Sequence, residues 1–156
     1  MKYPIIEYDD NGNETYFKSS DGFERWTEYD KKGNEIHYKN SDGYERWTEY
    51  DRSGNQIHFK NSEGFERWSS FDNKGNITHY KDSEGYEVWT EYDENGNITH
   101  YKTLDGYEKW TEYDNEGELM CNLIINSNGI IETIRKRSFS KELKRKYNLL
   151  LLRRKK

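Results

Sequence analysis

Apolar and polar residues alternate along most of this chain, and the alternation predicts β-strands. Between Glu35 and Tyr50, aromatic or aliphatic side chains are separated by Glu, Lys, Arg, His or Thr. A spacing of two is typical of a strand, whereas an amphipathic helix gives a spacing of about 3.6. We therefore predict one strand over residues 35–40, a three-residue turn over 41–43 and a second strand over 44–50.

The alternating stretch is one copy of a repeat with a period of 21 residues. The stretch GYERWTEYD, which starts at Gly43, recurs in variants that start at Gly22, Gly64, Gly85 and Gly106. A fixed period of this length indicates one supersecondary unit that is stacked many times. The chain thus predicts an all-β fold, an antiparallel meander of β-hairpins in a single twisted layer of about a dozen strands, with one C-terminal α-helix.

Glycine marks the end of two turns in every repeat. The second turn is predicted as four residues, Asp51 to Gly54, because Gly supplies the left-handed backbone with which a hairpin re-enters a strand. These turn lengths pair Lys39 with Glu45, His37 with Trp47 and Tyr38 with Arg46. Across the four-residue turn they pair Glu45 with Lys60, Trp47 with His58, Arg46 with Phe59 and Thr48 with Ile57.

The predicted register assigns the side chains to two faces. One face carries Ile36, Tyr38, Tyr44, Arg46, Thr48 and Tyr50, and the other carries Glu35, His37, Lys39, Glu45, Trp47 and Glu49. Continued across the sheet, it gives one row that alternates Lys with Glu, one that alternates His with Trp, and one that alternates Tyr or Phe with Arg. Such cross-strand pairs stabilise a sheet by roughly 0.2–1 kcal/mol each.

The domain boundaries follow from where the period begins and decays. We predict a repeat domain over residues 1–134, with repeats at about 8–28, 29–49, 50–70, 71–91 and 92–112 and a degenerate capping hairpin at 113–134. Residues 3–6 are expected to close the other end. Residues 135–156 form a basic tail in which a helix starts at Ser138 or Ser140, with Ser as its N-cap and Glu142 in its first turn. Its apolar stripe, Phe139, Leu143, Tyr147, Leu150 and Leu151, is expected to pack on the last hairpin or across the sheet.

The recurrent Tyr-Asp-x-x-Gly-Asn, as in Tyr29-Asp30 with Gly33-Asn34, followed by a later Gly43 and a closing Tyr50-Asp51, resembles the YD repeat of Rhs-type and teneurin proteins. In that family the repeats form a ribbon of hairpins that coils into a shell. The resemblance covers about residues 7–117, and the chain is too short to close such a shell. The period also resembles MORN-type repeats, some of which occur in small bacterial antitoxins. Neither resemblance carries a catalytic residue onto this sequence.

Composition argues against a thick core and reveals a separation of charge. Only 31% of the 156 residues are hydrophobic, although 16% are aromatic. The net charge of −5 divides into +10 for residues 135–156 and −15 for the rest. This asymmetry indicates an electrostatic partner, unless tail and body neutralise each other.

Compartment signals are few. Cys121 is the one cysteine, so no disulfide framework exists, and its apolar surroundings predict a buried thiol. The N-terminal residues show no apolar run that fits a signal peptide, and no stretch reaches the roughly 18 apolar residues of a membrane span. A cytoplasmic protein is expected.

The sequence predicts no enzyme, no cofactor and no metal. His37, His58, His79 and His100 recur two strands apart, roughly 9.6 Å, too far for one zinc ion. The Glu residues repeat equally, whereas hydrolysis needs one distinguished pair in a cleft.

The candidate partner-binding residues lie on one predicted face and in the tail. Trp and Arg dominate the energetics of many protein interfaces, and Lys/Arg clusters neutralise phosphates. The face residues are Trp26, Trp47, Trp68, Trp89, Trp110, Glu45, Glu66 and Glu87. The tail residues are Arg135, Lys136, Arg137, Lys144, Arg145, Arg153 and Arg154.

We hypothesise a non-enzymatic repeat protein, of bacterial or phage type, that binds another protein. Its sharper form is a small acidic inhibitor of a nucleic-acid-guided defence nuclease, similar in size and charge to anti-CRISPR proteins. The alternatives are a stand-alone YD- or MORN-like antitoxin or scaffold, and a nucleic-acid binder that acts through the basic tail. The partner class expected is a nuclease or toxin; an oligomer is compatible with all three.

Overall fold

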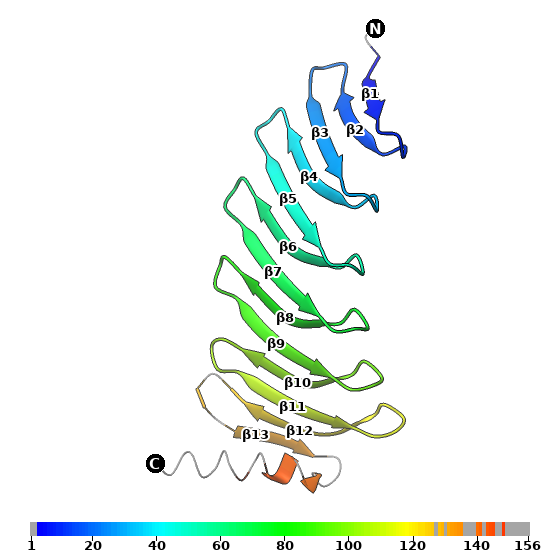
Figure 1. The fold of residues 1–156 in the computed structure, drawn as a ribbon. Helices are drawn as coiled ribbons and strands as arrows, with labels where there is room; N and C mark the ends of the chain where they lie inside the picture. The colour runs from blue at the N-terminus through cyan, green and yellow to red at the C-terminus, as the bar shows by residue number, and fades with distance from the viewer. Residues whose placement is uncertain are drawn as a thin grey trace. The chain divides into compact units, whose positions relative to one another are not determined.

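The computed structural model of the protein describes residues 3–126, 128–129, 131–135, 140–141, 143–145 and 148. Within these ranges the chain forms thirteen strands, whose order in the sheet is their order in the chain, from β1 to β13 (Figure 1). Neighbouring strands from β1 to β7 and from β9 to β13 pair antiparallel. The predicted all-β meander of hairpins is confirmed.

The strands occupy the alternating stretches and end where each turn sequence begins. Predicted residues 35–40 coincide with β4, and predicted residues 44–50 begin one residue before β5. The strands are β1 Ile5–Tyr8, β2 Glu14–Lys18, β3 Glu24–Tyr29, β4 Glu35–Asn40, β5 Glu45–Tyr50, β6 Gln56–Asn61, β7 Glu66–Phe71, β8 Ile77–Asp82, β9 Glu87–Tyr92, β10 Ile98–Thr103, β11 Glu108–Tyr113, β12 Leu119–Ile125 and β13 Ile131–Arg135.

The chain divides into two compact units, which are described separately. Unit 1 comprises Met1–Phe71 and Tyr80–Gly85, and unit 2 comprises Asp72–His79 and Tyr86–Lys156. Unit 1 therefore contains β1 to β7 and unit 2 contains β9 to β13, while β8 contributes residues to both.

The Asp of each Tyr-Asp pair closes the turn that follows it. Asp51 Oδ1 accepts hydrogen bonds from the backbone N–H groups of Ser53 and Asn55, and Oδ2 accepts one from the Asn55 side chain, at 2.8–2.9 Å. Donation from the side chain and backbone of Asn55 outweighs partial desolvation and lowers the pKa of Asp51. The same bonds recur at Asp9, Asp30, Asp72 and Asp93. The Tyr-Asp-x-x-Gly-Asn motif is thus a turn-closing device.

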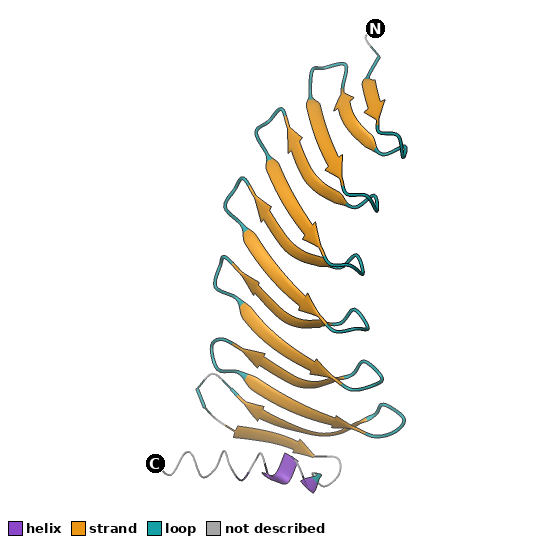
Figure 2. Cartoon of the chain, in the orientation of Figure 1, coloured by secondary structure: helices purple, strands orange, loops and turns teal. Residues whose placement is uncertain are grey.

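The other turn of each repeat also joins neighbouring repeats. Asn40 Oδ1 accepts the N–H groups of Asp42 and Tyr44, which confirms the three-residue turn over 41–43. Ser41 donates its N–H to the carbonyl of Glu24, and its hydroxyl accepts the Glu24 N–H at 3.1 Å. Ser62 and Ser83 make the same pair of bonds to Glu45 and Glu66. The turns lie at the two ends of the strands, in teal in Figure 2.

The register inside each hairpin is as predicted, whereas the register between hairpins is wrong by two residues. His37 lies opposite Trp47, as expected. Trp47, however, lies opposite Lys60 rather than His58. The other corrected pairs are Arg46 with Asn61 and Thr48 with Phe59, and the continuous Lys/Glu row is interrupted because Glu45 no longer meets Lys60.

Two local features cause this shift. The turn after β5 is closed by Asp51 N–H donating to the Asn55 carbonyl at 2.9 Å, so its loop has three residues rather than four. A bulge then follows, because Glu49 lies opposite His58 and Tyr50 opposite Gln56, which leaves Ile57 as the extra residue. A shift of two keeps each side chain on its face, so the predicted faces survive in general.

The apolar core lies in unit 2. Cys121 and Leu123 of β12 are completely buried, and they pack with Trp110 of β11 and with Leu143. The buried thiol predicted for Cys121 is confirmed. Backbone at 141, 143–145 and 148 is helical, and the Ser140 hydroxyl accepts the Leu143 N–H at 3.1 Å, which confirms Ser140 as the N-cap.

Leu143 packs in the apolar core against the last hairpin, as expected for the apolar stripe of the helix. It is the only residue of that stripe that the structure describes. Glu142, Phe139, Tyr147, Leu150 and Leu151 lie outside the described residues. Within the described ranges, no helix has the length and apolarity that crossing a membrane requires.

Replacing Gly54 by Ala should destabilise the fold through backbone strain alone. Gly54 has φ +91°, and no heavy atom lies within 4 Å of the position that a Cβ would take. The added methyl group therefore meets open space, but the backbone is held in the left-handed region that Ala disfavours. The expected cost is about 1–2 kcal/mol, measured by urea unfolding.

The neighbouring Ser53→Ala is the matched control, since it removes a hydroxyl from the same exposed turn without changing the glycine. Gly54→Asn should lie between the two, because Asn tolerates this conformation better than Ala. Equal stability of Gly54→Ala and Ser53→Ala would contradict the role assigned to the turn.

Candidate functional site: the Trp face

The tryptophans, histidines and most lysines of the repeats share one face, which we call the Trp face. In unit 1, successive cross-strand neighbours from β3 to β7 are Glu28, His37, Trp47, Lys60 and Glu66. The order Glu, His, Trp, Lys, Glu replaces the two separate rows that the sequence predicts. Each of these strands thereby contributes one member to a continuous row in which two adjacent rings lie between charged groups.

Three tryptophans, Trp47, Trp68 and Trp89, are each flanked by a histidine ring and a lysine ammonium. The His37 and Trp47 rings are stacked with centroids 5.4 Å apart and an interplanar angle of 11°. Lys60, on the opposite neighbouring strand, places its Nζ 4.9 Å from the Trp47 centroid, within the range of a cation–π interaction. The stacking predicted between His and Trp is confirmed at Trp47, Trp68, Trp89 and Trp110.

The histidines also join three strands electrostatically. His37 Nδ1 lies 3.1 Å from Glu28 Oε1 on β3, and its Nε2 lies 2.7 Å from Glu45 Oε1 on β5. Partial burial opposes a charged imidazole, but hydrogen bonds from the ring to these two carboxylates outweigh burial and raise the pKa of His37. The pKa of His58, between Glu49 and Glu66, is raised for the same reasons.

The predicted face residues have distinct environments. Glu45, Glu66 and Glu87 each contact a histidine Nε2 at 2.7–2.8 Å. The outermost acids are instead Glu28, Glu49 and Glu91, whose side chains are 68–69% exposed. Sequence reasoning did not single these out, although their 21-residue spacing, interrupted by Ser70, was the available signal.

The predicted tail residues are only partly described. Lys144 and Arg145 are exposed on helical backbone, and Arg135 ends β13. Lys136, Arg137, Arg153 and Arg154 lie outside the described residues. Their role as contacts to nucleic acid or an acidic partner remains a prediction.

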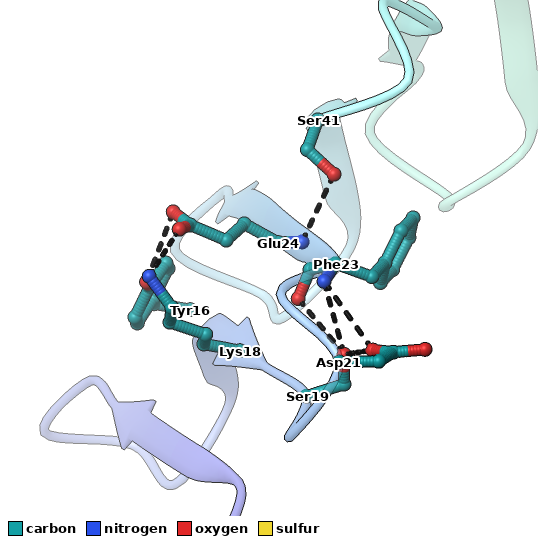
Figure 3. Close-up of polar contacts among 7 residues, drawn as sticks. All are labelled: Tyr16, Lys18, Ser19, Asp21, Phe23, Glu24 and Ser41. Carbon is teal, nitrogen blue, oxygen red and sulfur yellow. Dashed lines mark hydrogen bonds and ion pairs between the residues drawn. The ribbon is translucent and has the colours of Figure 1, made fainter.

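The first repeat varies the row. Tyr16 stands at the histidine position, and its hydroxyl donates to Glu24 Oε2 at 3.1 Å. Lys18 Nζ approaches the other oxygen of that carboxylate at 2.5 Å (Figure 3). Together these donors lower the pKa of Glu24.

The last repeat replaces the charged row by apolar groups. Cys121 stands at the histidine position and Leu123 at the lysine position, 84 residues after His37 and Lys39. The Cys121 thiol donates to Glu112 Oε2 at 3.1 Å, and the Ser140 N–H donates to the same oxygen at 3.1 Å. Glu112 therefore joins β11 to β12 and to the start of the helical segment, where Leu143 packs.

The opposite face combines arginine with aromatic rings. Arg46 places its Cζ 4.6 Å from the Tyr38 centroid and its Nη2 2.7 Å from Glu35 Oε1. Glu35 was predicted on the Trp face; the bulge next to Ile36 explains its contact with Arg46 on the other face. The threonines between these rows are buried, as Thr27, Thr48, Thr90 and Thr111.

Among the residues that the structure describes, no group of three or more His, Cys, Asp or Glu could hold a metal ion.

No protein-family model matches the chain, and no curated protein matches it. Solved structures of similar fold do exist. One is the crystal structure of TcdB2–TccC3–Cdc42, with a TM-score of 0.57 and 15% identity over 77% of this chain. Another is the Photorhabdus luminescens Tc holotoxin pore with a mutated TccC3, with a TM-score of 0.51 and 11% identity over 85% of this chain.

The chain spans 7% and 9% of the length of these two chains. At such low identity the likeness concerns the fold alone. It agrees with the architecture described above, a repeat of antiparallel β-hairpins.

Removing histidine charge should reduce the pH dependence of stability. Because the folded pKa of His37 and His58 is raised, their stabilising contribution is complete below the unfolded value of about 6.5 and is lost as the pH rises through the folded pKa. Thermal unfolding between about pH 6 and about pH 8.5 should therefore show a smaller loss of stability in His37→Gln/His58→Gln than in the parent chain.

The control is Lys31→Gln/Arg52→Gln, which removes two positive charges from exposed turns without a group that titrates in this range. It should keep the parental pH dependence. Parallel pH profiles for all three proteins would show that the Glu–His–Glu contacts do not stabilise the charged histidines.

Proposed function

We propose that this chain is a non-enzymatic, protein-binding β-hairpin repeat module of the YD-repeat or MORN-like kind. The observation that carries the proposal is the repetition of the Trp face itself. The repeats around Trp47, Trp68 and Trp89 present the same kinds of side chain at the same spacing, and repeat proteins use such extended surfaces to hold a partner along several units. Catalysis instead requires a few residues that stand apart from the rest.

The exposed chemistry of the Trp face favours a partner with a basic surface. The rings of Trp47, Trp68 and Trp89 are flanked by His and Lys, so a partner meets mainly the polar groups around them. Glu28, Glu49 and Glu91 are the most exposed acids of the row. Each of these carboxylates is held in place by a histidine Nδ1 3.1 Å away.

A sharper form of the proposal is an inhibitor that imitates nucleic acid. Proteins that bind nucleic acid present Lys and Arg for phosphates, and a regular series of carboxylates can occupy such a surface. A nucleic-acid-guided defence nuclease, as for anti-CRISPR proteins, is the partner that this form of the proposal names. The support is the regular exposed carboxylates together with the charge of −15 outside residues 135–156.

The test compares partner capture by three full-length baits in extract of the native host. The face variant is Glu28→Gln/Glu49→Gln/Glu91→Gln, in which Gln preserves a hydrogen-bonding group beside histidine but removes the charge. The matched control is Asp42→Asn/Glu63→Gln/Glu84→Gln, which removes the same charge from exposed turn tips. Captured proteins are identified by mass spectrometry and each complex is rebuilt from purified components.

A partner that is retained by the parent and the control, but bound at least about tenfold more weakly by the face variant, is expected. Three carboxylates at roughly 0.2–1 kcal/mol each account for a change of this order. The sharper form further requires that the chain displaces nucleic acid from this partner. Identical capture by all three baits would refute the Trp face as the binding surface.

A further inference from the structure

Each unit contains a concave site on or beside the Trp face. In unit 1, site N has a volume of about 820 Å³ and is lined by Glu7, Asp9, Trp26 and Lys39 among others. In unit 2, site C has a volume of about 580 Å³ and is lined by Glu91, Asp93, His100 and Trp110 among others. Both volumes lie in the range of roughly 300–1,000 Å³ that is usual for ligand sites.

The two sites are the same site in different repeats. Eight of the ten positions that line site N correspond, 84 positions or four periods later, to positions that line site C, and seven of the eight carry the same residue type. The pairs include Glu7 with Glu91, Asp9 with Asp93 and Trp26 with Trp110. The correspondence extends to hydrogen bonds, because the hydroxyls of Thr15 and Thr99 donate to the carbonyls of Glu7 and Glu91, respectively. An arrangement that recurs in both units is a property of the repeat rather than an accident of one loop.

Site N already contains a cationic side chain of the protein itself. Lys39 lines the site and places its Nζ 5.2 Å from the Trp26 centroid. The chain's own ammonium group thus lies beside an indole ring, in a site whose lining also includes the carboxylates of Glu7, Asp9, Glu24 and Glu28. Aromatic rings and carboxylates are the two kinds of group that attract a cation.

Site C retains the acids but has lost this lysine. The equivalent of Lys39 is Leu123, which is completely buried in the core. The described residues that line site C include no Lys or Arg. Its Glu91 contacts His100 at 3.1 Å, and Asp93 is held by backbone N–H groups of Asn95 and Asn97. Hydrogen bonds from Asn97 lower the pKa of Asp93, so this carboxylate is ionised at neutral pH.

We propose that site C binds a lysine or arginine side chain of a protein partner at its carboxylates, which stand at positions equivalent to carboxylates of site N. Glu91 and Asp93 supply the negative charge, and the aromatic and apolar lining accepts the stem of the side chain. This inference rests on the proposed function for the nature of the partner, and it names the group by which that partner is held.

The test uses a fluorescent tetralysine peptide and a tetraarginine peptide, with tetraglutamate as the negative probe, and the full-length chain. Glu91→Gln should weaken binding of both basic peptides about two- to fivefold, as expected for one exposed charge. Glu7→Gln, the same change at the equivalent position of site N, and Glu84→Gln, at a turn tip, should leave the affinity unchanged within about 1.5-fold. Circular dichroism of each variant verifies the fold.

A second measurement locates the peptide. Two-dimensional NMR of the indole N–H groups should show that tetralysine shifts the Trp110 signal, assigned with Trp110→Phe, more than the other four. Equal weakening by all three Gln variants, or equal shifts of all tryptophans, would mean non-specific attraction and would overturn the proposal.

A third variant tests whether the chain supplies the cation itself. The variant removes the four closing basic residues, as Arg153→Ser/Arg154→Ser/Lys155→Ser/Lys156→Ser. If it binds the peptides as well as or more weakly than the parent chain, the site is open to a partner. If it binds them clearly more tightly, the tail occupies the site and the assignment to a partner is overturned. The peptide result is separable from the proposed function. If the face variant loses a host partner but the chain binds no basic peptide, site C alone is refuted. If the chain binds the basic peptides but captures no host partner, the proposed function alone is refuted.

Discussion

The left-handed glycine at each turn fixes which side chains meet across this sheet. Every described turn of the repeats ends in such a glycine, and the adjoining Asp, Asn or Ser side chain closes the loop at three residues. The register that results places Trp47 between His37 on one neighbouring strand and Lys60 on the other. The contacts between histidines and glutamates, the cation–π contacts and the concave sites all depend on this register, so the turns determine the chemistry of the face.

A sheet with so few aliphatic residues needs another source of cohesion. In the repeats most side chains are only half-buried, and they interact as rows of ring, ammonium and carboxylate rather than as a core. Each such contact is individually weak, at roughly 0.2–1 kcal/mol, so cohesion comes from their number and from the backbone ladder. In unit 2 the row ends where Cys121 and Leu123 replace His and Lys, and there an apolar cluster with Trp110 and Leu143 takes over.

The alternation and the period sufficed to predict the strands, the hairpins and most of the two faces, and capping preferences narrowed the start of the helix to Ser138 or Ser140, because these features depend on local preferences. The register between hairpins was not predictable in this way. It depends on Asp51 pairing with Asn55 and on Ile57 standing as an extra residue, and neither changes the pattern of apolar positions. For the same reason the Glu28 contact to His37 was missed, since it joins residues that the expected register placed apart. The partner-binding residues named from sequence remain predictions.

The serine that begins the three-residue turn affects how the number of repeats in such a chain can change during evolution. Ser41, Ser62 and Ser83 each bind the backbone of the strand one unit earlier through an identical pair of hydrogen bonds. A unit therefore carries in its own sequence everything it needs to attach to its predecessor. An in-frame duplication or loss of 21 residues creates no new kind of junction, so the length of the sheet can evolve by whole units while the chemistry of each unit stays constant.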